Sequence, residues 1–508
     1  MDKETLSHYG WIVVLVLILS VMTALATPFG MFLARGFEST YIAFWYTSNK
    51  AEDIIDEGPD PIPEIKDKPD LWNYDSLSAA IGDVNVDTIG EHAIDDLAFE
   101  DAVAAVYKDE DTNETITVLL KNTVENEEII ITRSQTIHLG GNQVKFTGTT
   151  TGTGFTLKSP GSEPIDVTFD GRLYGSHVLI EDPRACALYV NQNSGVGANA
   201  TVLGGKWESH ATLTDAASRT VTFFVNDYST IHMEDVVVEC YADSDEINTS
   251  SVGVRVNRYA TAYLDNCNIF ADAKYGDSIY EDVYNATSEG ITNHGTTLIK
   301  NSEIFGTLTA IGNYGTLYVE GGKYHSTGHG GLYASKTDNT RGICYLRDAS
   351  FEETVNYTGR YDIAFSYDSS WNQSGIYVGG TAQAQNIKVY ADNCNFYGQR
   401  TPINIRYNVG AGYTTETWKE LNNSVYISNS TINHDSEQGI VVRHPSHSLY
   451  IGSGNNFSQT DVGDAKTGMG YISYADRAFS TNQVYARGEA LDNIFALTKP
   501  PAIDQLPA

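Results

Sequence analysis

The chain has 508 residues, of which 32 are Lys or Arg and 65 are Asp or Glu, so its formal net charge at pH 7 is −33. This charge repels nucleic-acid phosphates, and we expect no nucleic-acid partner. The content of 41% hydrophobic and 11% aromatic residues, with 45 Gly and 32 Tyr, excludes a disordered acidic chain and favours a large β-rich core.

Residues 1–35 are predicted to form an N-terminal membrane anchor or signal-anchor. The stretch from Trp11 to Phe32 carries no charged side chain and is long enough to cross the hydrocarbon layer of a bilayer. A cleaved signal peptide is the rival interpretation, because Ala24-Leu25-Ala26 resembles a cleavage site. A single-pass protein of the cell membrane with an extracellular C-terminal body is the simpler topology, and a virion surface is the alternative location.

Residues 36–70 are predicted to form a juxtamembrane segment and a linker. The last 20 of them contain eight acidic residues and four prolines, a composition that favours extended backbone and cannot pack a core. Residues 71–114 are expected to form an N-terminal cap with helical spacing at Asp75–Ile81 and Ala98–Val106. Residues 486–508 are expected to supply the C-terminal cap and tail.

A short pattern returns along the chain from about residue 200. An apolar strand is followed by a polar residue, then Asn, Asp or Gly, then a small residue, as in Leu264–Ile269 and Ala391–Phe396. Copies recur about every 31 residues, which indicates a β-solenoid with a tight corner at the third position. The corner residues are Gly204, Asp235, Asn266, Asn301, Gly321, Asp348, Asn393, Asn429 and Ser453.

The position after each corner residue is small and is expected to point into the core. Cys267 and Cys394 occupy it, so we interpret them as core residues. All five cysteines are interpreted as reduced and structural, because no C-x-x-C pair suggests zinc or a redox dithiol.

A second strand precedes each copy of this pattern. It begins with an apolar residue and mostly alternates, which predicts two strand types per coil and a parallel β-helix over residues 115–485. The copies are 254–258, 291–295, 311–315, 332–336, 363–367, 403–407 and 440–444.

In this repeat the chain resembles the right-handed parallel β-helix proteins of the pectin lyase-like superfamily, so the resemblance implies an all-β solenoid of that hand. The leader from Tyr9, the segment Ala26-Thr-Pro-Phe-Gly30 and the block Thr136-Ile-His-Leu-Gly-Gly-Asn142 are similar to surface proteins of gut Firmicutes and their phages. This narrower resemblance implies no particular activity.

The outward positions of the second strand form a cationic and aromatic stripe, predicted to bind an anionic or neutral glycan through Arg–carboxylate pairs and Tyr–sugar stacking. The alternative is a solvated outer face. The fourth positions are Asn257, His294, Tyr314, Ser335, Ser366, Arg406 and Arg443. The candidate ligand-binding residues are His294, Tyr314, Tyr333, Lys336, Tyr367, Trp371, Arg406, Tyr407, Arg443 and His444.

Two catalytic hypotheses remain open. His329 lies in a G-H-G motif, as in the polygalacturonases, but the N-T-D, paired Asp and R-I-K motifs of that family do not accompany it. A lyase would use Ca²⁺ as its cofactor, with Asp243, Asp245 and Glu246 as candidate ligands and Arg406 or Arg443 as the base. Otherwise no cofactor is expected, and the acidic group is a solvated loop.

Three functions therefore compete. The leading prediction is a non-enzymatic surface protein that binds a polysaccharide or cell-surface glycan, or that serves as an adhesive or structural body. The second is a polysaccharide lyase or glycoside hydrolase, because fold does not fix function. The third is a phage tailspike-like receptor-binding protein, which would have to form a trimer.

Overall fold

The computed structural model describes residues 68, 71–212, 220–244, 249–275, 286–326, 330–337, 340, 342–353, 374–380, 385–398, 401–407, 422–434, 440–442, 447–459, 472–473 and 483–486. The chain divides into two compact units. One comprises Met1–Glu57 and Val355–Phe365 and lies outside the described residues. The other comprises Gly58–Thr354 and Ser366–Ala508, and the strands below belong to it.

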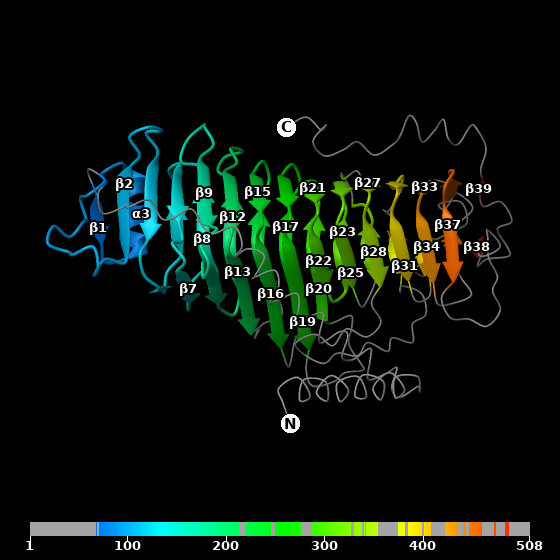
Figure 1. The fold of residues 1–508 in the computed structure, drawn as a ribbon, viewed down its shortest axis with the longest axis horizontal. Coiled ribbons are helices and arrows are strands. Elements are labelled where there is room, and N and C mark those ends of the chain that lie inside the picture. The colour runs from blue at the N-terminus through cyan, green and yellow to red at the C-terminus, as the bar shows by residue number, and fades with distance from the viewer. Residues whose placement is uncertain are drawn as a thin grey trace, which may run out of the picture. The chain divides into compact units, whose positions relative to one another are not determined.

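Three sheets wind around a common core, and successive coils add one parallel strand to each sheet (Figure 1). Sheet A contains β1 (Trp72–Tyr74), β2 (Ala104–Lys108), β3 (Thr115–Leu119), β6 (Gln135–His138), β9 (Asp166–Gly171), β12 (Asn199–Gly204), β15 (Thr230–Glu234), β18 (Thr261–Asp265), β21 (Thr296–Lys300), β24 (Thr316–Glu320), β27 (Ile343–Arg347), β30 (Lys388–Asp392), β33 (Ser424–Ser428), β36 (Ser448–Ile451) and β39 (Gln483–Ala486).

Sheet B contains β4 (Thr123–Glu125), β7 (Gln143–Thr147), β10 (His177–Glu181), β13 (Lys206–Thr212), β16 (Val237–Ser244), β19 (Asn268–Tyr275), β22 (Glu303–Gly306), β25 (Lys323–Ser326), β28 (Ser350–Glu353), β31 (Asn395–Gly398), β34 (Thr431–His434) and β37 (Asn456–Gln459). Sheet C contains β5 (Ile129–Ile131), β8 (Thr153–Lys158), β11 (Cys186–Asn191), β14 (Thr220–Val225), β17 (Thr249–Val256), β20 (Ala286–Asn293), β23 (Thr309–Asn313), β26 (Gly330–Ala334), β29 (Ser374–Gly380), β32 (Thr401–Tyr407), β35 (Ile440–Val442) and β38 (Ile472–Ser473).

The predicted parallel β-helix is confirmed, but each coil has three strands where the sequence predicted two. The repeated pattern spans the end of a sheet A strand, a corner and the start of a sheet B strand, as at β18, Asn266 and β19. Asn266 has φ 50°, and this left-handed residue ends one strand before the next begins. The ninth corner is Gly454, with φ 75°, and not the predicted Ser453. The backbone N–H of an earlier corner residue donates to the carbonyl oxygen of the residue just before the corner on the next coil, and Asn429 N donates to Ser453 O. Ser453 is therefore the residue before the corner.

The small residue after the corner points inward as predicted. The backbone N–H of Cys267 donates to Ser302 Oγ at 3.0 Å, and that of Cys394 donates to Ser430 Oγ at 3.0 Å on a later pair of coils. Both cysteines are buried, and burial raises the pKa of each thiol to about 12. Their interpretation as core residues is confirmed.

The predicted second strand corresponds to sheet C, with one correction. Ile291, Ile311 and Leu332 pair in register on successive coils. The next strand in register is β29, with Ile376 opposite Leu332, and not 363–367. Residues 363–367 lie outside the described residues.

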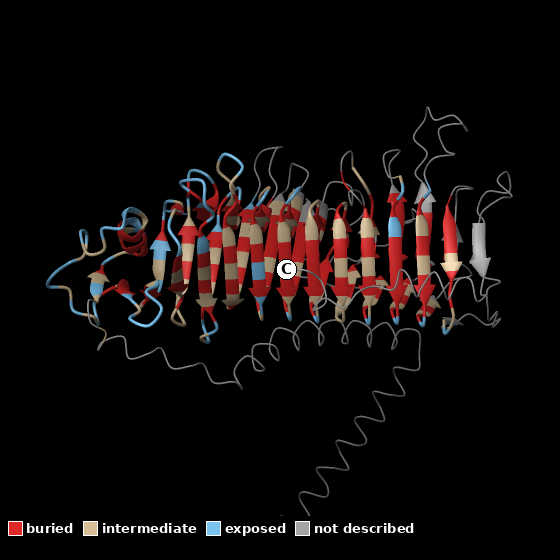
Figure 2. Cartoon of the chain, turned by 90° about the horizontal axis from the view of Figure 1, so that it is seen from above, coloured by how far each residue is buried: buried red, intermediate tan, exposed pale blue. Residues whose placement is uncertain are grey.

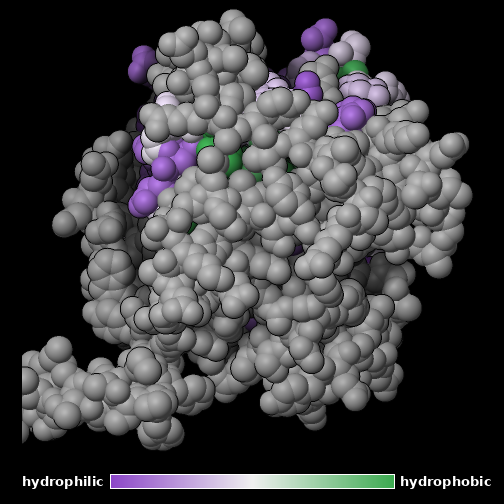
Figure 3. Space-filling model, turned by 90° about the vertical axis from the view of Figure 1, so that its right-hand side faces the viewer, coloured by the Kyte–Doolittle hydropathy of each residue, from purple (hydrophilic) through white to green (hydrophobic). Residues whose placement is uncertain are grey.

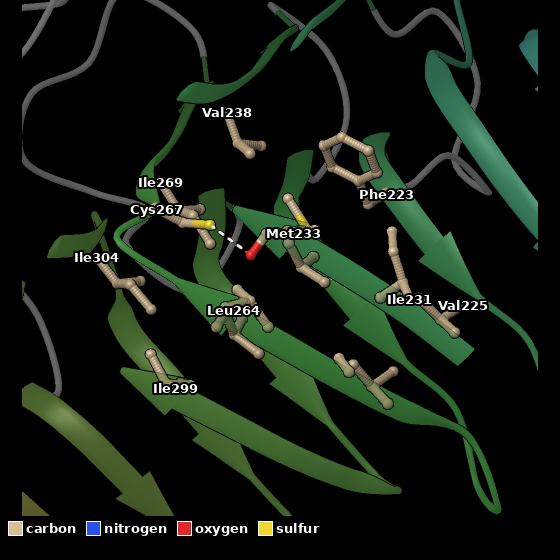
Figure 4. Close-up of a cluster of buried hydrophobic side chains, with 14 of the residues drawn as sticks. Phe223, Val225, Ile231, Met233, Val238, Leu264, Cys267, Ile269, Ile299 and Ile304 are labelled. Atoms are coloured by element: carbon tan, nitrogen blue, oxygen red, sulfur yellow. Dashed lines mark hydrogen bonds between the residues drawn. The ribbon is translucent and has the colours of Figure 1, made fainter. Parts of the chain in front are cut away.

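Buried residues of the three sheets form one continuous hydrophobic core. Figure 2 shows buried residues in red along the strands of the described coils. Figure 4 shows Phe223, Met233, Leu264 and Ile299, which belong to this core and lie on successive coils. Burying each such side chain contributes about 1.5–3 kcal/mol to stability relative to leaving it exposed.

At the C-terminal end of the β-helix (Figure 3), the visible described side chains are mostly hydrophilic.

The N-terminal end of the core is covered by α3 (Leu77–Val86). Ser76 caps this helix by accepting a hydrogen bond from Ala79 N at 3.3 Å, and Leu77 and Ile81 join the core. A helix at Asp75–Ile81 was predicted, but Ala98–Val106 was wrongly expected to be helical. Its last residues lie in β2, which pairs antiparallel with β1 and β3 and so extends sheet A.

Among the described residues, no helix is both long enough and apolar enough to cross a membrane. The segment from Trp11 to Phe32, the linker apart from Lys68, and the predicted C-terminal cap apart from Ala486 all lie outside these residues. The membrane anchor therefore stays a prediction.

Candidate functional site

The outer face of sheet C carries two adjacent columns of side chains, which we call the sheet C face. Backbone pairing places each residue of a column beside its equivalent on the next coil. The first column is Tyr189, Phe224, Arg255, Thr292, Gly312, Tyr333, Tyr377 and Asn404. The second is Asn191, Asn226, Asn257, His294, Tyr314 and Ser335, which confirms the predicted alignment of its last four members.

Asparagine side chains form a hydrogen-bonded ladder in the second column. Asn226 Nδ2 donates to Asn191 Oδ1 at 2.9 Å, and Asn257 Nδ2 donates to Asn226 Oδ1 at 3.0 Å. Arg255 Nε donates to Asn257 Oδ1 at 3.3 Å, while its guanidinium lies 5.4 Å from the ring centroid of Phe224. The ladder and the cation–π contact together orient Arg255 on this face.

Beyond the ladder the face becomes aromatic. The rings of His294 and Tyr314 stack with centroids 4.7 Å apart, and Tyr314 meets Tyr333 edge to face at 6.0 Å. Tyr333 in turn lies 5.4 Å from Tyr377. The structure therefore brings together three of the predicted residues, His294, Tyr314 and Tyr333. Among the described residues, no hydrogen bond or ion pair joins Lys336 to them.

Glu289 also belongs to this site, although the sequence analysis did not single it out. Its carboxylate accepts a hydrogen bond from the Thr292 hydroxyl and lies over Gly312, where a Cβ would come within 2.7 Å of Glu289 Oε2. Burial, with the negative charge of Glu289 added to it, raises the pKa of the Tyr333 phenol. Tyr333 therefore stays protonated at neutral pH and acts as a hydrogen-bonding group. A glycine in an otherwise bulky column was the signal that could have revealed this contact.

The remaining predicted residues are not assembled into a site by the described part of the chain. His329, Tyr367, Trp371, Arg443, His444, Asp245 and Glu246 lie outside it. Arg406 and Tyr407 belong to β32, opposite Gly379 and Gly380, but nothing is described of their side chains.

Of the predicted lyase site, Asp243 and Arg406 lie within the described residues, and the structure separates these two. Asp243 lies on β16 of sheet B, where its Oδ2 is 3.3 Å from His210 Nε2. Arg406 lies on sheet C five coils later, which corresponds to about 24 Å along the helix. Asp243 and Arg406 therefore do not meet. Within the described ranges, no group of three or more His, Cys, Asp and Glu side chains is arranged to hold a metal ion.

A second polar cluster, not predicted from the sequence, lies on the outer face of sheet B. Lys206 Nζ is 2.9 Å from Glu208 and 3.0 Å from Glu239 on the next coil, and His177 lies 3.4 Å from Glu208. Burial disfavours the charged carboxylate, but the hydrogen bonds from His177 and Lys206 outweigh it and lower the pKa of Glu208 to about 2. Glu208 is therefore ionised at neutral pH and cannot serve as the general acid of a glycosidase pair.

No family model and no curated protein matches this chain. Among solved structures, the chain is similar to the crystal structure of bacteriophage CBA120 tailspike protein 3. The two are 10% identical with a TM-score of 0.25, over 69% of this chain and 56% of the tailspike. The chain thus spans little more than half of that protein, and its assignment as a parallel β-helix rests on its own strand pairing.

Proposed function

We propose that this chain is a surface protein that binds a glycan on the sheet C face without converting it. The two adjacent columns of the sheet C face carry the proposal, because together they place an amide ladder, the Arg255 guanidinium and aromatic rings on one face of a rigid scaffold. These are the groups that hydrogen-bond sugar hydroxyls, pair with sugar carboxylates and contact sugar rings.

The chemistry of the described carboxylates supports binding over turnover. Glu208 is held ionised by Lys206 and His177, and Asp243 lies on a different sheet from Arg406. Glycoside hydrolysis by two carboxyl groups needs one of them protonated beside the scissile bond. On the sheet C face, Glu289 is held by Thr292, and the residues that make up the two columns include no carboxylate.

We also propose that the apolar segment from Trp11 to Phe32 holds the β-helix at a membrane, with the glycan-binding body outside the cell. Membrane fractionation of cells that express the full chain tests this. Release of a trimer that lacks residues 1–35 would instead favour the tailspike-like alternative.

The test of binding uses the full chain on immobilised acidic and neutral polysaccharides, including polygalacturonate and xylan, with and without Ca²⁺. Retention, absorbance of unsaturated uronates and new reducing ends are followed together. We expect retention without product, weakened by Arg255→Ala and by Tyr314→Ala. Lys145→Ala is the matched control, because Lys145 pairs with Glu181 on the outer face of sheet B at 2.6 Å. Release of unsaturated or reducing product would show an enzyme and overturn the proposal.

A further inference from the structure

Two tyrosines project from the corner between sheets C and A, beside the sheet C face. Tyr228 follows β14 and Tyr259 follows β17, each as the third residue of a four-residue turn. The turns close through Ser229 N to Asn226 O and Ala260 N to Asn257 O, both at 3.1 Å. Their first residues, Asn226 and Asn257, belong to the amide ladder, so the two tyrosines are attached directly to the candidate site.

The backbone of both tyrosines is unfavourable for such a residue. Each has φ 64°, in the left-handed region where turns normally use Gly or Asn. Non-glycine residues with this conformation concentrate at functional sites. Retaining a bulky aromatic residue at the same strained turn position on two successive coils therefore points to a role for the rings themselves.

The rings are exposed, and their arrangement leaves one face open. They stack with centroids 5.3 Å apart at an interplanar angle of 8°, so each covers one face of the other. Tyr228 is nevertheless 53% exposed and Tyr259 62% exposed. In the described part of the chain, the one ring that contacts Tyr259 is that of Tyr228, on one face.

The corner of the next coil is shorter than the corner that carries Tyr259. Four residues, 257–260, separate β17 from β18, whereas only His294 and Gly295 separate β20 from β21. Gly295 packs so closely on the turn that a Cβ would collide with the carbonyl oxygen of Ala260. The shorter corner therefore places Gly295, which has no side chain, against the turn that carries Tyr259.

We propose that the open face of Tyr259 is the stacking subsite for one pyranose ring of a neutral glycan. This rests on the proposed function, because the same glycan would continue over the sheet C face. The axial C–H face of a pyranose packs on an aromatic ring, and the Asn257 amide, the His294 imidazole and the Tyr314 phenol of the sheet C face suit sugar hydroxyls. The net charge of −33 disfavours a polyuronate.

The experiment titrates the full chain with cellohexaose, mannohexaose and hexagalacturonate by calorimetry, and records the proton spectra of the bound neutral sugars. We expect Tyr259→Ala and Tyr259→Gly to weaken binding of a neutral hexasaccharide at least tenfold. Gly tolerates φ 64°, so the second variant keeps the turn. Tyr259→Phe should retain affinity and the ring-current shifts of the sugar C–H protons. Tyr174→Ala, at a corner between sheets A and B, is the control, because Tyr174 is 70% exposed.

The outcomes separate this inference from the proposed function. Unchanged affinity of Tyr259→Gly, together with weakened binding of Arg255→Ala or Tyr314→Ala, would overturn the subsite and leave the glycan-binding face. Binding of hexagalacturonate alone would overturn the neutral ligand class. No binding of any of the three sugars, and no retention on any polysaccharide, would overturn both.

Discussion

In the described part of this β-helix, tyrosines stack in two places, and the two stacks differ in what surrounds each ring. On the outer face of sheet A, five tyrosines form a continuous ladder with centroid spacings of 5.0, 5.3, 4.7 and 4.2 Å. At the corner between sheets C and A, two tyrosines form a single exposed pair. The members of the ladder are Tyr318, Tyr345, Tyr390, Tyr426 and Tyr450.

In the ladder, both faces of each inner ring are occupied by its neighbours, and all five residues sit in regular strands. Such a stack presents ring edges to its surroundings and stabilises the pairing of coils. At the corner, a left-handed backbone destabilises the folded state by about 1–2 kcal/mol per tyrosine, whereas stacking of the two rings stabilises it by about 0.5–1.5 kcal/mol. The corner pair therefore does not contribute to stability. A stack of rings therefore indicates binding only where one ring face remains open and the backbone is strained.

The strongest test of this comparison removes a ring from the middle of the ladder. Tyr390 is buried between Tyr345 and Tyr426, so Tyr390→Ala should lower the free energy of unfolding by about 2–4 kcal/mol. Chemical denaturation measures the loss, and Tyr390→Phe should recover most of it. A loss no greater than that of Tyr228→Ala would break the distinction between the two stacks.

A second test uses a charged group far from either stack. Asp83 is buried in α3, where burial disfavours its charge, but hydrogen bonds from His92 and Tyr74 lower its pKa. The stability that the ionised Asp83 contributes is present above about pH 4, the usual pKa of an Asp side chain. It is lost as the pH falls through the lower pKa that Asp83 has in the folded protein. Asp83→Asn should cost about 2 kcal/mol at pH 7 and less at acid pH.

The acid-unfolding midpoint of both proteins measures this effect. Neither tyrosine stack should influence it, because phenols stay neutral in acid. An Asp83→Asn protein that loses as much stability as the wild type between pH 7 and pH 3 would contradict the assignment.

A third test titrates the ladder with alkali. Burial raises the pKa of Tyr390 and Tyr426, with a further increase from neighbouring phenols. The stability they contribute is complete below their unfolded pKa near 10 and is lost as the pH rises through the higher folded value. Tyr426→Phe should therefore lose less stability above pH 10, by at most about 1 kcal/mol after solvent screening. Denaturation midpoints at pH 9 and pH 11, together with phenolate absorbance, check this, and equal losses would contradict it.

The smallest expected change in stability is at the corner. Tyr259→Gly removes the strain and the stack together, so the free energy of unfolding should change by less than about 0.5 kcal/mol. Thermal or chemical denaturation measures this change beside the glycan titrations. A loss of several kcal/mol would show that the corner pair supports the fold as the ladder does, and would remove the contrast between the two regions.

Local features of the sequence were enough to predict the β-helix. The spacing of Asn266, Asn301 and Asn393 predicted a corner in every coil, and each of them has a positive φ. The number of strands per coil was wrong because a single left-handed residue separates two strands without any loop that a sequence pattern would reveal. Residues 363–367 were predicted to be the sheet C strand after β26, whereas β29 takes that place. The corners Asp348 and Asn393 are 45 residues apart, and apolar alternation does not show which segment of that interval pairs with β26.

The candidate site was predicted only in part. His294, Tyr314 and Tyr333 were found because their positions follow from the strand register. Glu289 was missed because its contact reaches across a coil to Gly312, and Tyr259 was missed because its backbone angle is invisible in the sequence.

The sequence alone was enough for the solenoid period, eight of the nine predicted corner residues and the inward-facing positions. Each of these depends on interactions between residues that are close in the chain, which leave a repeating signal. The tertiary structure decided which side chains meet across coils, which ring faces stay open and which carboxylates are paired. These contacts depend on strand register and corner length between segments 20 to 45 residues apart, and no local pattern encodes them.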